Sequence, residues 1–316
     1  MRIVLMSTRL IGEKILEKLV GKGENIVAVG STPVPEGVKD RMQEAAIRLK
    51  LPFFQVKQVN SEEFLEQYRK WNADLNILAG LRAFLPEAIL RFPKLGTIGW
   101  HPSLLPKYAG VNSICWPIIF GEKKTANTLF WTDKGIDSGP ILMQKEVVIS
   151  KDDTLGSLYA KKILPQAVEM VSEAVDLVKS GNPPRIPQDL NQYSYYSFIT
   201  EKDIKINWVQ PGKRIYDLIR GTNPFPGAET NFNNIKFKVL DSELKIGFAA
   251  FPVMNKIITG AVKAGDVIEI SNDGINVLVP DGTLLIKKVI FEGAQMNAAE
   301  FATKVDIKTN SRLGDR

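Results

Sequence analysis

Two side chains in this sequence, His101 and Asp137, are of the types that move protons during catalysis. His101 is the only histidine and opens the run HPSLLP at 101–106, whereas Asp137 lies in the turn sequence GIDSG at 135–139. Histidine titrates near neutral pH, and the prolines of its run restrict the backbone around it. The sequence therefore places one near-neutral titrating group on a rigid loop. The alternatives are that His101 is a packing residue and that Asp-Ser-Gly forms only a common turn.

A histidine and a carboxylate without a matching serine or cysteine nucleophile suit acyl transfer directly to an external nucleophile. The imidazole can donate a hydrogen bond to a carbonyl oxygen that becomes negative. The carboxylate can orient the imidazole and accept the proton that the nucleophile loses. We therefore predict that His101 is an oxyanion donor and that Asp137 is its orienting residue and proton acceptor.

The first half of the chain has the pattern of an α/β fold, because short apolar runs alternate with amphipathic segments. The predicted strands are Arg2–Ser7, Asn25–Ser31, Pro52–Val56, Asp74–Ala79 and Thr97–His101. The predicted helices are Gly12–Lys22, Val38–Leu51, Ser61–Trp71 with Ser61 as N-cap, and Pro86–Arg91. We expect a Rossmann-like, mostly parallel sheet. His101 ends its fifth strand, at the edge where such sheets bind ligands.

The pattern changes after His101. Further strands are predicted at Thr125–Trp131 and Ile141–Ile149, followed by a long helix at Thr154–Ser180. A helix at Gly212–Gly221 then precedes four short strands with turn residues between them, which indicates a small antiparallel, OB-like β-barrel. These strands are Ile235–Leu240, Asp266–Ser271, Gly274–Val279 and Thr283–Phe291. The expected domains are a catalytic domain at 1–182, a proline-rich linker at 183–205 and the barrel at 206–316.

Composition and missing motifs narrow the function. The first strand-to-helix turn, residues 7–12, lacks the glycines of a dinucleotide-binding loop, and the sequence has no P-loop and no Cys/His zinc spacing. The net charge of +6 is spread out, and residues 206–316 hold 14 basic and 12 acidic side chains. One cysteine, no signal peptide and no apolar run long enough to cross a bilayer favour a cytoplasmic protein. We expect neither a metal nor a membrane partner.

The runs HPSLLPKYAG at 101–110 and FWTDKGIDSG at 130–139 resemble the folate-dependent formyltransferase family. That family includes methionyl-tRNA formyltransferases, sugar N-formyltransferases and the hydrolase domain of 10-formyltetrahydrofolate dehydrogenase. The resemblance is strongest to the hydrolase domain and covers nearly the whole chain. It is carried further by QKE at 144–146, KINW at 205–208, IRG at 219–221 and NPFPGA at 223–228.

The resemblance implies that 10-formyltetrahydrofolate is the co-substrate and that His101 and Asp137 are the catalytic pair. It also implies that the loop at 79–86 and the turn at 133–139 hold the pterin ring of the donor. Apolar contacts are expected from Leu81, Phe84, Leu85 and Leu104, and turn contacts from Asp133, Lys134, Gly135 and Ile136. For Leu104 and its neighbour Leu105, core packing is the alternative.

Two departures from the family leave the acceptor open. Amine-formylating relatives carry asparagine where this chain has Gly99, and relatives commonly carry arginine where it has Ala109. The tRNA-specific relatives also have a longer basic insertion where this chain has only residues 31–39. We expect transfer to an amine, with tRNA possible but not favoured. Hydrolysis of the donor to formate and tetrahydrofolate is the first alternative, and a catalytically silent folate-binding protein is the second.

Overall fold

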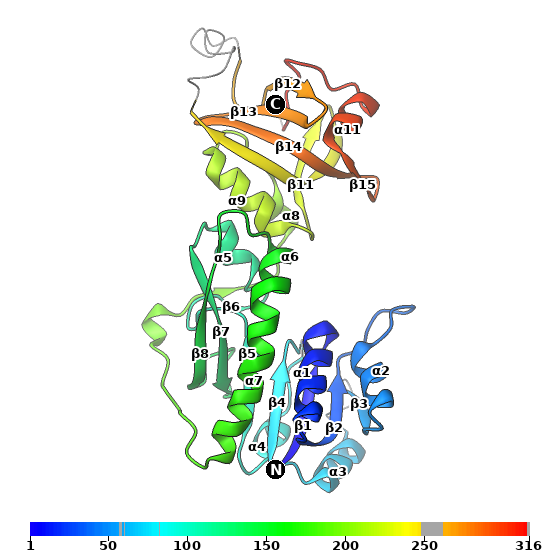
Figure 1. The fold of residues 1–316 in the computed structure, drawn as a ribbon, viewed down its shortest axis with the longest axis vertical. Coiled ribbons are helices and arrows are strands. Elements are labelled where there is room, and N and C mark those ends of the chain that lie inside the picture. The colour runs from blue at the N-terminus through cyan, green and yellow to red at the C-terminus, as the bar shows by residue number, and fades with distance from the viewer. Residues whose placement is uncertain (57–58, 60, 82, 248–261, 315–316) are drawn as a thin grey trace. The chain divides into compact units, whose positions relative to one another are not determined.

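The computed structural model describes residues 1–316 except 57–58, 60, 82, 248–261 and 315–316. The chain forms two compact units that alternate along the sequence (Figure 1). Unit 1 comprises residues 1–113, 125–147 and 160–196, and unit 2 comprises residues 114–124, 148–159 and 197–316. Arg82, inside one predicted pterin loop, lies outside the described residues.

Unit 1 contains a seven-stranded, mostly parallel sheet, which confirms the predicted Rossmann-like class. Its strand order is β3-β2-β1-β4-β5-β7-β8. The strands are β1 (Arg2–Ser7), β2 (Asn25–Ser31), β3 (Phe53–Gln55), β4 (Leu75–Ala79), β5 (Thr97–His101), β7 (Lys124–Trp131) and β8 (Ile141–Val148). Strands β1 to β5 pair in parallel, and β7 runs antiparallel to β5. The carboxyl ends of β4 and β5 therefore lie side by side.

The helices of unit 1 lie near the predicted positions, with different ends. They are α1 (Arg9–Gly21), α2 (Arg41–Arg48), α3 (Glu62–Trp71), α4 (Glu87–Arg91) and α7 (Leu164–Lys179). The prediction for α2 is too long, because the Asp40 carboxylate caps the helix by accepting hydrogen bonds from the backbone N–H groups of Met42 and Gln43. The predicted Ser61 cap of α3 is confirmed by a 3.1 Å hydrogen bond from the Phe64 N–H.

The long helix predicted at Thr154–Ser180 is interrupted. It consists of α6 (Leu155–Leu158), a π-helical turn at Tyr159–Ile163, and α7. Pro165 lies in the first turn of α7, and proline has no N–H with which to continue the preceding hydrogen-bond ladder. The ladder therefore shifts its register before Pro165. Thr154 caps α6 in a capping box, at the residue where the predicted helix begins.

A buried polar network fixes β5 against β4. The Tyr68 hydroxyl donates to Asn76 Oδ1 at 2.7 Å, and the Asn76 amide donates to the Ile89 carbonyl at 3.0 Å and to Thr97 Oγ1 at 3.2 Å. Burial raises the pKa of the Tyr68 phenol far above its usual value, so that the hydroxyl stays a donor. Because Thr97 begins β5, this network helps to fix the strand that ends at His101.

Unit 2 contains a six-stranded antiparallel sheet, which confirms the predicted change of architecture. Its order is β10-β11-β14-β13-β12, with β15 paired to β14. The strands are β10 (Ala228–Phe232), β11 (Ile235–Ile246), β12 (Val267–Ser271), β13 (Gly274–Val279), β14 (Gly282–Phe291) and β15 (Ala294–Asn297). The helices are α5 (Cys115–Ile119), α6, α8 (Glu201–Ile204), α9 (Gly212–Thr222) and α11 (Ala298–Lys304). Helix α9 packs on β11, and α11 packs on β14.

Two features are absent from the described part of the chain. No described helix combines the length and apolar character needed to cross a bilayer. No group of three or more His, Cys, Asp or Glu side chains within the described ranges has an arrangement that could hold a metal ion.

Candidate active site

The structure brings His101 and Asp137 together at the carboxyl end of β5. His101 is 5% exposed, and its Nδ1 lies 3.3 Å from Asp137 Oδ2. The other ring nitrogen, Nε2, lies 2.8 Å from the backbone carbonyl oxygen of Tyr108. Both ring nitrogens thus have partners, and the pair lies at the sheet edge where the sequence predicts a site.

The hydrogen-bond partner of Nε2 shows which ring nitrogen of His101 carries a hydrogen. The Tyr108 carbonyl can only accept, so Nε2 carries a hydrogen and donates it. A hydrogen bond between Nδ1 and the carboxyl group then requires a second hydrogen, either on Nδ1 or on Asp137. The contact with Asp137 is thus left to Nδ1. The sequence predicts Asp137 alone as the orienting residue, and the Tyr108 carbonyl was missed because a backbone group leaves no residue-type signal.

Asp137 is held by the backbone of the opposite loop. Its Oδ2 accepts a 2.9 Å hydrogen bond from the Gly110 N–H, and its own backbone is left-handed with φ of 53°. Aspartate is one of the few non-glycine residues found in that conformation. Gly139 ends the turn, and a side chain there would meet the Trp131 carbonyl oxygen at 1.8 Å from its Cβ. The turn therefore depends on glycine at 139.

Residues 186–196, which we call the bracing segment, contact the loop that follows His101. They lie inside the stretch predicted as a linker. Ser194 Oγ accepts from the Tyr108 N–H at 2.9 Å, and the Ser194 carbonyl accepts from the Ala109 N–H at 2.8 Å. Strand β9 (Tyr195–Tyr196) pairs in parallel with β6 (Ala109–Gly110). The bracing segment thus fixes the residue whose carbonyl holds the His101 ring.

The bracing segment also contacts the Asp137 turn. The Gln188 side-chain amide donates to the Asp137 carbonyl at 2.8 Å and to the Gly139 carbonyl at 2.7 Å. The Tyr193 hydroxyl donates to the Ile136 carbonyl at 3.0 Å. Burial, followed by the charge of Asp137, raises the pKa of Tyr193 above its usual value, so the hydroxyl remains protonated at neutral pH. Neither Gln188 nor Tyr193 was predicted from the sequence.

The two predicted pterin loops are neighbours. Lys134 Nζ lies 3.8 Å from Glu87 Oε2, which connects the turn at 133–139 to the first residue of α4. Phe84 is 89% exposed and Ile136 is 39% exposed, so both present apolar surface that a flat ligand could cover. Asp133, Lys134 and Gly135 are also exposed.

The remaining predicted contact residues are less accessible. Leu81 and Leu85 are half-buried and pack against the core of β1 to β3, and Leu104 is half-buried. Leu105 is buried with Ala109 and Phe130, so core packing describes it. The loop after His101 is also fixed by Gln144, whose amide donates to the Leu105 carbonyl at 3.0 Å and to Thr128 Oγ1 at 2.8 Å.

A phenylalanine side chain fills the space beside Gly99. Gly99 on β5 pairs with Phe130 on β7, and a Cβ added at Gly99 would lie 2.7 Å from Cζ of the Phe130 ring. The Phe130 ring is itself buried. A side chain at position 99 would therefore collide with the Phe130 ring.

We expect Gly99→Ala to lower the free energy of unfolding by about 1–3 kcal/mol, since added carbon in a packed core forces neighbours aside. Combining it with Phe130→Leu should lower that free energy by less than the sum of the two single changes, because the smaller side chain makes room. Urea unfolding of the three variants measures this. Additive losses would show that Phe130 does not restrict position 99.

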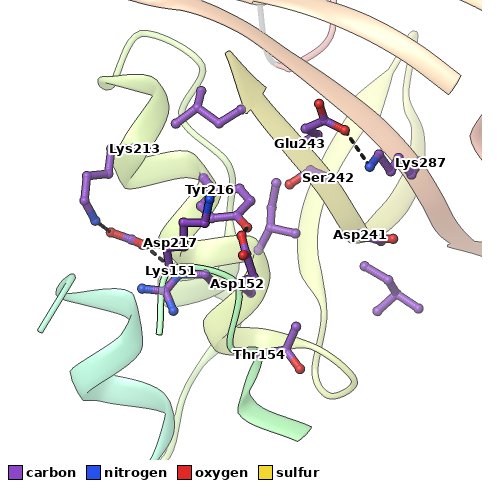
Figure 2. A pocket seen from close by; sticks show the side chains of 14 residues that line it. Lys151, Asp152, Thr154, Lys213, Tyr216, Asp217, Asp241, Ser242, Glu243 and Lys287 are labelled. Carbon is purple, nitrogen blue, oxygen red and sulfur yellow. Dashed lines mark hydrogen bonds and ion pairs between the residues drawn. The ribbon is translucent and has the colours of Figure 1, made fainter. Parts of the chain in front are cut away.

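A cavity of about 680 Å³ lies within unit 2, between α9, β11 and residues 151–154 (Figure 2). Three of its four basic side chains have acidic partners. Lys213 and Arg220 contact the Asp217 carboxylate at 2.5 and 2.8 Å, and Lys287 contacts Glu243 at 2.7 Å. Because these charges neutralise each other, the cavity gives no comparable evidence of catalysis. Arg220, from the IRG run, is buried and also donates to the backbone.

Comparison with known proteins identifies the family. Residues 1–175 match the formyl transferase domain, and residues 198–305 match the formyl transferase C-terminal domain. The chain is 32% identical over 321 residues to methionyl-tRNA formyltransferase of Clostridioides difficile, covering 99% of this chain and 100% of that protein. The chain therefore belongs to the formyl transferase family, as its motifs predict.

A second group of relatives is longer. Mitochondrial 10-formyltetrahydrofolate dehydrogenase of Homo sapiens is 32% identical over 302 residues, which cover 94% of this chain and 32% of that protein. The chain thus spans about a third of the length of the dehydrogenases that it matches.

Solved structures share the fold. HypX from Aquifex aeolicus, determined in complex with tetrahydrofolic acid, aligns with a TM-score of 0.69 and 16% identity over 98% of this chain and 48% of HypX. WlaRD, a sugar 3N-formyl transferase determined with dTDP and 5-N-formyl-THF, aligns with a TM-score of 0.69 and 19% identity over 90% of this chain and 97% of WlaRD.

Proposed function

We propose that this protein transfers a formyl group from 10-formyltetrahydrofolate to an amine, with His101 and Asp137 as its catalytic residues. The observation that carries the proposal is the 3.3 Å contact between His101 Nδ1 and Asp137 Oδ2 at the carboxyl end of β5. Family membership and the folate-bound structures of relatives support the choice of donor.

The residues of the pair would divide the work. The donor supplies an activated formyl group. His101 would donate a hydrogen from Nδ1, the side that contacts Asp137, so that this hydrogen is shared between the carboxylate and a carbonyl oxygen that gains negative charge, while the Tyr108 carbonyl holds the ring through Nε2. Asp137 would accept the proton that the attacking nitrogen loses as it bonds to the formyl carbon. The bond from that carbon to N10 of the folate would then break, and N10 would take up a proton to give tetrahydrofolate. Because both residues are fixed by backbone contacts, little reorganisation is needed during the reaction.

The exposed side chains beside the pair fit a folate. Phe84 and Ile136 offer apolar surface for a flat aromatic ring system. Lys134, in the turn of Ile136, lies 3.8 Å from Glu87, which follows the loop of Phe84. Exposed backbone at 133–136 can bind the amide-like edge of a pterin. We propose these two loops as the donor site, with Leu81, Leu85 and Leu104 contributing as half-buried apolar residues.

Hydrolysis of the same donor is the second candidate. Gly99 provides no side-chain amide of the kind that the resemblance expects at this position in amine-formylating relatives. Asp137 could accept a proton from water as readily as from an amine. The similarity to 10-formyltetrahydrofolate dehydrogenase supports hydrolysis as the second candidate function.

Incubation with 10-formyltetrahydrofolate alone separates these functions. Release of tetrahydrofolate without any amine would identify a hydrolase. Release that requires an added amine, such as an amino-sugar nucleotide, would identify a transferase. Saturable binding of the donor without release under either condition would identify a silent folate-binding protein and would contradict the proposal.

Transfer RNA is not the acceptor that we expect. Each phosphate neutralised on a duplex makes the slope of log affinity against log salt more negative by about 0.9. A tRNA-specific enzyme needs several lysine or arginine side chains that together neutralise phosphates. Residues 31–39 and the nearly balanced charge of residues 206–316 do not supply them. We predict weak tRNA binding that disappears at physiological ionic strength while donor turnover persists. Saturable formylation of methionyl-tRNA at micromolar concentration in that salt would overturn this prediction.

A further inference from the structure

The turn that carries Asp137 needs support from outside. Residues 133–136 are exposed, and the Asp137 backbone is left-handed. Within the turn, Asp133 accepts hydrogen bonds from the Gly135 N–H at 2.9 Å and from Ser138 Oγ at 3.0 Å. These bonds do not involve the backbone carbonyl of Asp137 or that of Gly139. Those two carbonyls are therefore held from outside the turn, in addition to the hydrogen bond from the Gly110 N–H to the Asp137 carboxylate.

Gln188 binds both of them through a single nitrogen. Its Nε2 donates to the Asp137 carbonyl at 2.8 Å and to the Gly139 carbonyl at 2.7 Å, so both N–H bonds of the amide are used. Its Oε1 is buried and accepts no hydrogen bond from any described residue. A buried, unpaired amide oxygen is unfavourable. An apolar side chain of the same length would avoid that cost, so the benefit of glutamine at 188 lies in its two donors.

We infer that Gln188 is a positioning residue for Asp137, and that without its two hydrogen bonds the Asp137 carboxylate moves away from His101. The inference rests on the proposed function. Misplacement of a catalytic group by about 1 Å can lower a rate by about 100-fold. The 3.3 Å contact between the carboxylate and Nδ1 would not survive such a shift.

Gln188→Met keeps the length and volume of the side chain and removes both donors. It should lower kcat by about 10-fold or more while KM for 10-formyltetrahydrofolate stays within about 2-fold of the wild type, because the two lost bonds reach the carbonyls of Asp137 and Gly139 and not residues 133–136, which are proposed to contact the donor. In an Asp137→Asn background, measured by single turnover, the same change should lower the rate by less than about 2-fold, since Gln188 acts through the carboxylate.

The matched control is Gln192→Met. Gln192 lies in the same bracing segment, but its amide donates only to Asp189 Oδ2 at 2.9 Å on an exposed surface. Its replacement should leave kcat unchanged. Gln188→Glu is a second variant that keeps a polar side chain. As a carboxylate it has no donor at neutral pH, and it regains one when protonated. Its kcat relative to the wild type should therefore rise as the pH is lowered towards about 5.

Several results would overturn the inference. Wild-type kcat in Gln188→Met would do so, and so would equal losses in the wild-type and Asp137→Asn backgrounds, because both show that Gln188 does not act through Asp137. If Gln188→Met does not fold by circular dichroism, a Gln188→Glu variant with wild-type kcat at neutral pH would overturn it equally. An inactive wild-type protein would instead contradict the proposed function.

Discussion

Replacing His101 with alanine is expected to lower the turnover of 10-formyltetrahydrofolate by at least about 100-fold, the effect of removing one donor to a developing oxyanion. Gly99 carries no side chain that could substitute, and Asp137 cannot donate as a carboxylate. Steady-state kcat measures the loss. Binding of the donor should remain, because the exposed residues proposed to contact it, Phe84 and residues 133–136, are separate from His101.

The control for this variant is its fold. His101 is buried and hydrogen-bonded to the Tyr108 carbonyl, so alanine leaves a space and an unpaired acceptor. Circular dichroism and donor affinity should therefore be measured beside kcat. Near-normal turnover in a folded His101→Ala protein would remove the histidine from the mechanism.

Replacing Asp137 with asparagine is expected to lower kcat by about 100-fold or more, within the range for loss of a positioned proton acceptor. The amide oxygen of asparagine can still accept the hydrogen bond from the Gly110 N–H, and asparagine tolerates the left-handed backbone at 137. The change therefore removes the charge and keeps the turn. Steady-state kinetics of Asp137→Asn, which give kcat and KM for the donor separately, measure this effect.

A specific outcome would contradict the role of Asp137. If Asp137→Asn retained a kcat within about 3-fold of the wild type, proton transfer would have to use another group, such as bulk water. If kcat fell together with donor affinity, the carboxylate would be acting in donor binding. The predicted result is a large fall in kcat with little change in KM.

Much of the fold follows from local sequence signals. Strands such as β1 and β5 are short apolar runs with clear ends, and the predictions match their observed positions. The caps at Ser61 and Thr154 are also local, because a short polar side chain binds the N–H three residues ahead. The interruption of the long helix at 159–163 was not predicted, although Pro165 was a visible signal for it.

The candidate site was only partly predictable. His101 and Asp137 lie in short runs of recognisable residues, and the structure places them in contact. The groups that position these two residues have no such local sequence signal. The Tyr108 carbonyl belongs to the backbone, and Gln188 binds two carbonyls that lie 51 and 49 positions earlier in the chain. The bracing segment contains Pro187 and follows two further prolines, a composition typical of linkers. Such long-range bonds to backbone leave little trace in residue pattern.

The most direct test of the central claim uses 10-formyltetrahydrofolate with an isotopic label in the formyl group. The labelled donor is incubated with the wild type and with His101→Ala, each with and without an amino-sugar nucleotide or another small primary amine, and the labelled products are separated. With the wild type and an amine present, we expect the label to move from the folate into an amide of that amine, with release of an equal amount of tetrahydrofolate. With His101→Ala, we expect the label to stay on the folate. Recovery of the label in formate would show that the protein is a hydrolase and not a transferase. Label that stays on the folate under every condition, despite saturable donor binding by the wild type, would contradict formyl transfer by this protein.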